Sequence, residues 1–210
     1  MNEHALRERI CEHAASLFAR GFSPGSSGNI SVRLDDGIIV TPTNSCLGRL
    51  QPARLSRLDA QGELVAGDPP SKEAVLHQAV YRARPSAQAI VHLHSPYSVA
   101  VSCLADADPG DVLPPITAYY VMRVGRLPLL PYYPPGDAEL AQAVGRATAD
   151  QRAVLLANHG PVVAGKSLDA AVYSAEELEE TAKLYLLLRG ENTRFLTDAQ
   201  VAQLRQRFAS

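Results

Sequence analysis

The sequence predicts one α/β domain spanning residues 1–210, in which early β-hairpins are followed by strands interleaved with helices. Two pairs of strand-forming segments surround turn-forming Asp-Gly and Gln-Gly pairs, and two apolar runs, AIVHLH and AVLLAN, indicate strands further along. Between and after these runs, apolar residues recur at helical spacing. The chain is long enough to bury a core, and no linker or internal repeat divides it.

The first half is expected to contain two helices and two hairpins. Residues 6–18 carry apolar side chains at helical spacing, and the Gly- and Ser-rich segment 23–30 then forms a loop. Hairpins are expected around residues 36–37 (Asp-Gly) and 61–62 (Gln-Gly). Ser71 is the expected N-cap of the helix KEAVLHQAVYRA, because its hydroxyl can accept a hydrogen bond from a free backbone N–H.

The second half is expected to alternate between strands and helices. AIVHLH (89–94) predicts a strand and SPYSVAVSCLA a short helix, while the proline- and tyrosine-rich segment 109–136 indicates loops and short strands. DAELAQAVGRATAD is predicted to be a helix, and AVLLAN and PVVAG to be strands. Ser167 caps a long helix that Gly190 ends, and Thr197 begins a T-x-x-Q capping box in the last helix.

Charge and cysteine content narrow the functional classes. The 20 basic and 22 acidic residues leave a formal net charge of -2, which argues against nucleic acid or a membrane surface as the main partner. No apolar run is long enough to span a membrane, and the N-terminus carries charges where a secretion signal requires an apolar block. Cys11, Cys46 and Cys103 form no CxxC motif, so a cytoplasmic protein with free thiols is expected.

Three histidines are candidates for a metal site. On a strand, His92 and His94 point to the same face, so both imidazoles can reach one ion; the alternative is two ordinary surface or core histidines. His159 directly follows an apolar strand, and a third imidazole there would leave coordination positions open for a substrate. The other histidines lie in predicted helices and are expected to be surface or packing residues: His4, His13 and His77.

Glu73 lies in the first turn of its predicted helix. A carboxylate there complements the helix dipole, and this explanation suffices if the residue stands alone. Beside a metal ion, however, the same carboxylate can serve as a ligand or as a general acid/base.

Short polar segments also lie at loop or helix-start positions, where backbone N–H groups and hydroxyls bind anions. Each segment alone is an ordinary turn, and only their combination favours a phosphate site. The segments are Ser26-Ser27-Gly28-Asn29, Thr41-Pro42-Thr43-Asn44 and Ser71-Lys72.

Taken in order, the motifs SSGNIS, TPTN, SKE, HLH and ANHG resemble the class II aldolase/adducin family over nearly the whole chain. The resemblance implies a three-layer α/β/α sandwich around a mainly antiparallel sheet, and a homotetramer with active sites between subunits. It implies that His92, His94 and His159 hold a divalent metal, with Zn2+ expected and Mn2+, Co2+ or iron as alternatives. Glu73 would be the catalytic acid/base and would touch the metal when no substrate is bound.

The same resemblance places the phosphate of a small substrate near a polar set: Gly28, Asn29, Thr43, Asn44 and Ser71. One residue departs from the family pattern, because the sugar-phosphate aldolases have a second serine where this chain has Lys72. Its positive charge can meet a phosphate or a substrate carboxylate.

The phrases PTNSCLGRL, VLPPITAYYVMRVG and LANHGPVVAGKSL look closest to the 3-oxo-tetronate 4-phosphate decarboxylases within this family. This resemblance implies decarboxylation of a phosphorylated sugar acid to dihydroxyacetone phosphate and CO2 through a metal-stabilised enediolate, as a step of sugar-acid catabolism. An aldolase reaches the same enediolate, so the metal ligands leave open a fuculose-phosphate-type aldolase that cleaves a ketose 1-phosphate to dihydroxyacetone phosphate and a hydroxyaldehyde.

Two further alternatives are weaker. A sugar-phosphate epimerase resembles this chain less across residues 109–136, and a non-catalytic adducin-like scaffold has no physical need for a metal cage. Family aldolases also use a tyrosine of the neighbouring subunit as proton donor. Tyr119 or Tyr120 would correspond to it, although packing is an equal alternative for an aromatic residue in a proline-rich segment.

Overall fold

The computed structural model describes residues 2–208, and in it eight strands form one sheet with the order β4-β3-β2-β1-β5-β8-β7-β6. Neighbouring strands are antiparallel, except that β6 runs parallel to β7. The strands are β1 (Asn29–Leu34), β2 (Gly37–Val40), β3 (Ser56–Asp59), β4 (Leu64–Ala66), β5 (Ala89–His92), β6 (Leu129–Leu130), β7 (Ala153–Leu156) and β8 (Gly160–Gly165).

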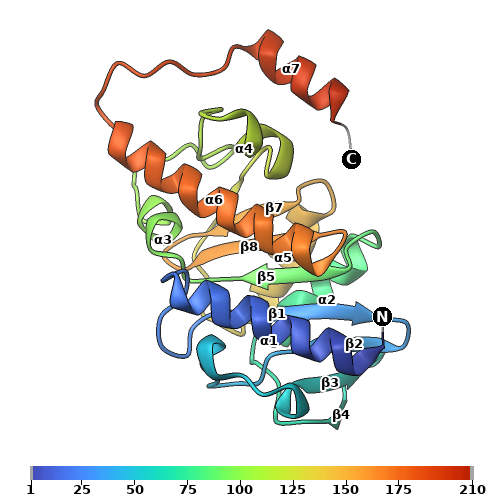
Figure 1. The fold of residues 1–210 in the computed structure, drawn as a ribbon. Coiled ribbons are helices and arrows are strands. Elements are labelled where there is room, and N and C mark those ends of the chain that lie inside the picture. The colour runs from blue at the N-terminus through green and yellow to red at the C-terminus, as the bar shows by residue number, and fades with distance from the viewer. Residues whose placement is uncertain (1, 209–210) are drawn as a thin grey trace.

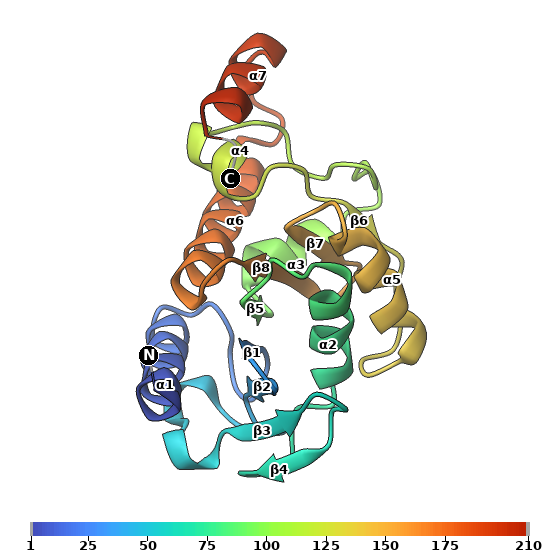
Figure 2. The same cartoon turned by 90° about the vertical axis from the view of Figure 1, so that its right-hand side faces the viewer.

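Helices cover both faces of this sheet, with α1 and α6 on one side and α2 and α5 on the other (Figures 1 and 2). The helices are α1 (Glu3–Ala19), α2 (Ala74–Ala83), α3 (Pro96–Ser102), α4 (Ala118–Arg123), α5 (Ala138–Thr148), α6 (Leu168–Leu188) and α7 (Asp198–Arg207). Along β5, Val91 packs into the core under α1 and α6, whereas Ile90 packs into the core under α2 and α5. The predicted three-layer α/β/α sandwich around a mainly antiparallel sheet is therefore confirmed.

The first predicted hairpin is present, but its turn lies one residue earlier than expected. Leu34 pairs with Gly37, so the turn is formed by residues 35–36 and Gly37 is the first residue of β2. A Cβ atom at Gly37 would lie 2.0 Å from the carbonyl oxygen of Leu58 on β3, so this position accepts only glycine. The second hairpin joins β3 to β4 through residues 60–63, as predicted.

The expected N-cap of α2 is wrong by two residues. The helix begins at Ala74 with Glu73 in the N-cap position, and the Ser71 hydroxyl accepts a hydrogen bond from the Glu73 N–H at 3.2 Å. The chain before the helix is held extended, because the Ser71 N–H donates to the Thr41 carbonyl at 3.2 Å. Because of this hydrogen bond the helix begins later in the sequence than predicted, and Glu73 lies at its N-cap.

Segment 109–136 contains a helix that was expected to be loop and short strand. Helix α4 begins after Thr117, whose hydroxyl accepts a hydrogen bond from the Tyr120 N–H. The other predicted helices are confirmed, including the capping box at Thr197. Within residues 2–208, no helix is long and apolar enough to cross a membrane.

Candidate metal centre

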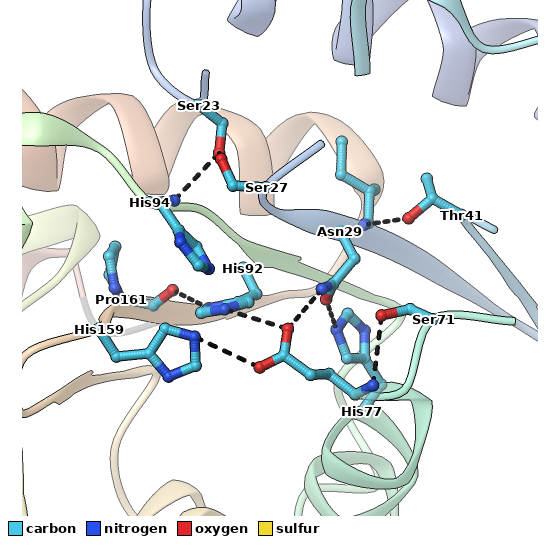
Figure 3. A network of polar contacts seen from close by, with 12 residues as sticks. Ser23, Ser27, Asn29, Thr41, Ser71, His77, His92, His94, His159 and Pro161 are labelled. Atoms are coloured by element: carbon cyan, nitrogen blue, oxygen red, sulfur yellow. Dashed lines mark hydrogen bonds and ion pairs between the residues drawn. The ribbon is translucent and has the colours of Figure 1, made fainter. Parts of the chain in front are cut away.

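Four titratable side chains from three parts of the fold meet at one end of the central strands. Glu73 begins α2, His92 ends β5, His94 follows two residues later, and His159 lies in the turn between β7 and β8. One potential ligand atom from each side chain lies within 4.8 Å of all the others. The three imidazole rings turn toward one another, with centroids 4.7 to 5.1 Å apart (Figure 3). The structure thus brings together the four residues that the sequence singled out, and their binding of a metal stays a prediction.

The backbone of the β7–β8 turn places His159 in this group. Asn158 adopts the left-handed conformation with φ 55°, and Gly160 has φ 156°. A Cβ atom at Gly160 would lie 2.2 Å from the carbonyl oxygen of Leu93. Glycine therefore lets the turn approach the chain just after β5 closely enough for the histidines of both segments to meet.

His92 is oriented by a backbone carbonyl. Its Nδ1 lies 2.8 Å from the Pro161 carbonyl oxygen, which can only accept, so Nδ1 carries the proton. Nε2 then points into the group and is the ring nitrogen available to a metal, in the way that backbone carbonyls orient metal-binding imidazoles.

Two buried polar atoms of this group, His92 Nε2 and Glu73 Oε1, have no hydrogen-bond partner among the described residues. An unpaired buried polar atom is costly, so two of them facing one point call for a bound group. Three imidazoles and one carboxylate are a suitable donor set for a divalent transition metal. The side chains of this chain therefore fit a metal ion.

The protonation states suit the same interpretation. Burial, together with the neighbouring histidines, lowers the pKa of both His94 and His159 to about 4, so at neutral pH both rings are neutral and able to coordinate. Burial by itself would raise the pKa of Glu73, but nearby His92, a hydrogen bond from Asn29 and His159 outweigh it and lower that pKa.

The two oxygens of Glu73 have different surroundings. Oε2 accepts a hydrogen bond from the Asn29 amide at 2.7 Å and lies 3.4 Å from His92 Nε2. Oε1 lies 3.4 Å from His159 Nε2. The carboxylate thus stands between a fixed amide on one side and the open group of imidazoles on the other.

Two of the residues predicted to bind the substrate phosphate lie directly beside this group. Gly28 has φ 79°, and a Cβ atom there would lie 2.6 Å from Ser23 Oγ. The Asn29 side chain contacts Glu73 and His77, so its amide is already engaged within the protein.

The other predicted phosphate residues lie on two segments that are hydrogen-bonded together. The Thr43 N–H donates to the Pro69 carbonyl at 2.9 Å, and Pro42 and Pro70 form an isolated β-bridge. These contacts hold the Thr43-Asn44 turn against the Pro69-Pro70 segment that leads into Ser71.

The predicted tyrosines lie away from the four-residue group within this chain. Tyr120 is only 1% exposed and packs in the core, and Tyr119 is 60% exposed and lines a cavity at the opposite end of β8, near Gly165. A cavity of about 560 Å³ beside His94 and His159 is instead lined by Tyr132, which sequence reasoning did not single out.

For His77, the sequence left open whether the side chain lies on the surface or in the interior. It is fully buried and hydrogen-bonds to Asn29 and Ser31, so it is an interior residue and not a surface residue. The available signal was its position four residues after Glu73, which places both side chains on one face of the helix.

Comparison with known proteins agrees with this geometry. The sequence-family model of the Class II Aldolase and Adducin N-terminal domain matches residues 8–186. The 3-oxo-tetronate 4-phosphate decarboxylase of Escherichia coli K12 is 52% identical over 204 residues, covering 97% of this chain and 96% of that protein. The protein of the same name from Haemophilus influenzae is 49% identical and covers 99% of both chains. L-fuculose phosphate aldolase of E. coli K12 is more distant, at 31% identity over 212 residues.

Solved structures give the same relationship. The crystal structure of YgbL, described as a putative aldolase/epimerase/decarboxylase from E. coli, superposes with a TM-score of 0.95 at 50% identity, covering 97% of this chain and 99% of that one. An L-fuculose 1-phosphate aldolase superposes with a TM-score of 0.87 at 27% identity, covering 97% and 96%. The chain belongs to the class II aldolase/adducin family.

Proposed function

We propose that this protein is a divalent-metal-dependent carboxy-lyase that converts 3-oxo-tetronate 4-phosphate into dihydroxyacetone phosphate and CO2. One observation carries this proposal. The Glu73 and three-histidine group, with its unpaired buried atoms, occurs in a chain 52% identical over nearly its full length to a protein named for that activity. The conversion breaks one carbon–carbon bond, so the enzyme is a lyase.

His92, His94 and His159 would hold the metal, with Glu73 able to join them when no substrate is bound. Neutral imidazoles favour Zn2+, and Mn2+ and Co2+ fit the same donors. Bound there, the metal supplies a Lewis acid that stabilises negative charge on the substrate oxygens.

The proton chemistry belongs to Glu73. The substrate is a β-keto acid, so loss of CO2 leaves the electron pair of the broken bond conjugated with the adjacent carbonyl. One proton must then be added to the carbon that lost CO2, which gives dihydroxyacetone phosphate. Glu73 is buried beside the histidines and carries an oxygen without a hydrogen-bond partner. Because its pKa is lowered, Glu73 starts as a carboxylate and must take up a proton from the solvent before it delivers that proton to the substrate carbon.

We propose that the substrate phosphate lies near Gly28, Asn29, Thr43, Asn44 and Ser71. Lys72 directly follows this set and would add a charge-assisted contact to the phosphate or the carboxylate. Tyr119 is the exposed member of its pair and would reach only a neighbouring subunit's site. A homotetramer and a cytoplasmic location, in which the free Cys11, Cys46 and Cys103 stay reduced, complete the proposal.

Product analysis of the metal-loaded enzyme with 3-oxo-tetronate 4-phosphate tests this function. β-Keto acids lose CO2 unaided, so an enzyme-free reaction is the essential control. We expect enzyme-dependent release of CO2 and dihydroxyacetone phosphate in equal amounts, abolished by a chelator and restored by added Zn2+. Metal analysis of the same sample tests whether each chain binds one metal ion. Sedimentation tests whether four chains form one particle.

A rate equal to the enzyme-free control would overturn the decarboxylase. Cleavage of a ketose 1-phosphate by the same sample would then identify an aldolase, which makes the same dihydroxyacetone phosphate but releases an aldehyde in place of CO2.

A further inference from the structure

A ladder of buried side chains joins strand β1 to helix α2 directly behind Glu73. Asn29 and Ser31 lie on one face of β1, and Glu73, His77 and Tyr81 follow one another at four-residue intervals from the N-cap position of α2 into the helix. Two residues along a strand and four along a helix advance the chain by similar amounts, about 7 Å and about 6 Å. The two elements therefore present their polar side chains in register.

The contacts along the ladder are short. Asn29 Nδ2 lies 2.7 Å from Glu73 Oε2, and Asn29 Oδ1 lies 2.5 Å from His77 Nε2. His77 Nδ1 lies 2.6 Å from Ser31 Oγ, which in turn lies 2.9 Å from the Tyr81 hydroxyl. Every member of the ladder is buried (Figure 3 shows its inner part).

Chemistry fixes the direction of every hydrogen bond in this ladder. The carboxylate of Glu73 accepts, so the Asn29 amide nitrogen must face it and the amide oxygen must face His77. His77 Nε2 must then carry the ring proton. Burial, with a smaller contribution from nearby His92, lowers the pKa of His77 to about 3, so the ring is neutral and Nδ1 is an acceptor. Ser31 donates to Nδ1 and Tyr81 donates to Ser31.

We propose that His77 is a positioning residue that, through Asn29, fixes the Glu73 carboxylate with Oε2 bonded and Oε1 free in the site. This inference rests on the proposed role of Glu73 as the group that delivers a proton. Without a fixed donor, the carboxylate could turn both oxygens away from the position that faces the histidines. The ladder keeps the Asn29 Nδ2 donor facing Glu73, because only one orientation of the Asn29 amide satisfies both of its buried neighbours, so one oxygen stays bonded while the other points into the site.

The first test reads the ring proton directly in the protein without substrate. In nitrogen-15 NMR of histidine-labelled protein, with the His77 signals identified by their loss in His77→Gln, we expect a neutral ring protonated on Nε2. A proton on Nδ1 would overturn the proposal, because the Asn29 amide would then be reversed. This result does not depend on which reaction the enzyme performs.

The second test separates positioning from simple stability. His77→Phe fills the same space but removes the N–H that faces Asn29, whereas the amide of His77→Gln can replace that N–H. For His77→Phe we expect kcat to fall roughly 10-fold to 100-fold, with KM and bound metal close to the wild-type values. His77→Gln should recover most of the lost kcat.

The matched control is His13→Phe, since His13 lies on α1 and hydrogen-bonds to Asp169, away from Glu73. It should leave kcat unchanged. Equal kcat in His77→Phe and wild type would contradict the proposal, as would a loss that appears only in the denaturation midpoint. If His77→Phe does not fold, Ser31→Ala removes the donor to Nδ1 and the same kcat, KM and metal measurements decide.

All variants are compared on whichever substrate the wild-type enzyme turns over. Failure of the wild-type enzyme to release CO2 refutes the proposed function, while the NMR result still decides whether the ladder is arranged as proposed.

Discussion

Both carboxylate oxygens of Glu73 face the histidines, but only one of them, Oε2, is also held by the Asn29 amide. In Glu73→Gln the side chain keeps its size but can no longer deliver a carboxylic acid proton. We expect the three histidines to retain most of the metal while kcat falls roughly 100-fold to 10,000-fold.

Reaction in heavy water makes this prediction sharper. Wild-type enzyme should place one deuterium on a single face of the new CH2OH carbon, and the residual reaction of Glu73→Gln should lose that selectivity. Normal turnover with unchanged selectivity in Glu73→Gln would show that another group delivers the proton.

Removal of one imidazole should affect metal and activity together. His92→Ala and His159→Ala each delete one of the donors that face the common point, so we expect both metal content and turnover to be lost. His13→Ala is the matched control, because it removes a half-buried histidine from α1. Activity that survives in His92→Ala after the metal has gone would contradict a metal-dependent reaction.

Lys72 is the residue at which this chain departs from the aldolase pattern. In Lys72→Ser the loss of a charge-assisted contact should raise KM for the carboxylated substrate roughly 10-fold or more. Lys166→Ser removes an exposed lysine at the far end of β8 and should leave KM unchanged. Identical KM values for all three proteins would exclude a role of Lys72 in substrate binding.

At the scale of elements, helix α3 follows almost directly after His94, so its anchoring affects the segment that carries this histidine. Glu179 on α6 accepts hydrogen bonds from the N–H groups of Tyr97 and Ser98 at 2.8 Å each and from the Ser98 hydroxyl at 2.6 Å. This buried carboxylate therefore caps the start of α3 from a distant helix, although α3 has no side-chain cap of its own.

Glu179→Ala should destabilise the protein by at least about 2 kcal/mol, because it leaves buried donors without acceptors. Glu180→Ala is the matched control, since the neighbouring Glu180 side chain is exposed and its pairing with Lys183 is a surface contact. Urea unfolding at constant pH measures both. Equal midpoints for the two variants would mean that Glu179 does not support α3.

The helices and strands also show how much of the fold could be predicted from the sequence. Hairpins, helices and apolar strands are local patterns, and these elements are present, although β5 ends at His92 and His94 lies just beyond the strand on which it was predicted. The helix at Ala118–Arg123 was missed because a proline-rich context outweighed the Thr117 cap, and the start of α2 was misplaced because a contact with Thr41 sets it. The candidate metal ligands were predicted from the His-x-His pair His92 and His94 and from the order of the family motifs along the chain.

The remaining parts of the candidate site required tertiary structure. The Pro161 carbonyl that orients His92 belongs to a strand 69 residues away in the sequence, and the ladder through His77 joins segments 46 to 48 residues apart. No local pattern encodes such contacts. The placement of Tyr119 against a partner subunit and the single-domain organisation stay predictions.

For the whole molecule, burial of neutral histidines predicts how stability depends on pH. In the folded protein without metal, the pKa of His77 is about 3 and the pKa values of His94 and His159 are about 4, each lowered from 6.5 chiefly by burial. Between these values and 6.5 the unfolded chain binds protons that the folded chain does not. The contribution of these histidines to the free energy of unfolding is therefore fully present above about pH 6.5. This contribution is lost progressively as the pH falls toward about 4 and below.

Urea unfolding of chelator-treated protein from about pH 7.5 to about pH 5 measures this dependence. Each fully buried ring contributes up to about 1.4 kcal/mol per pH unit in this window, and more accessible rings contribute less. His77→Gln removes the fully buried ring among these three, so the free energy of unfolding of this variant should fall less steeply on acidification than that of wild type. His4→Gln, in which an exposed histidine is lost, should keep the wild-type slope. Parallel slopes for wild type and His77→Gln would mean that the His77 ring is not held neutral by burial.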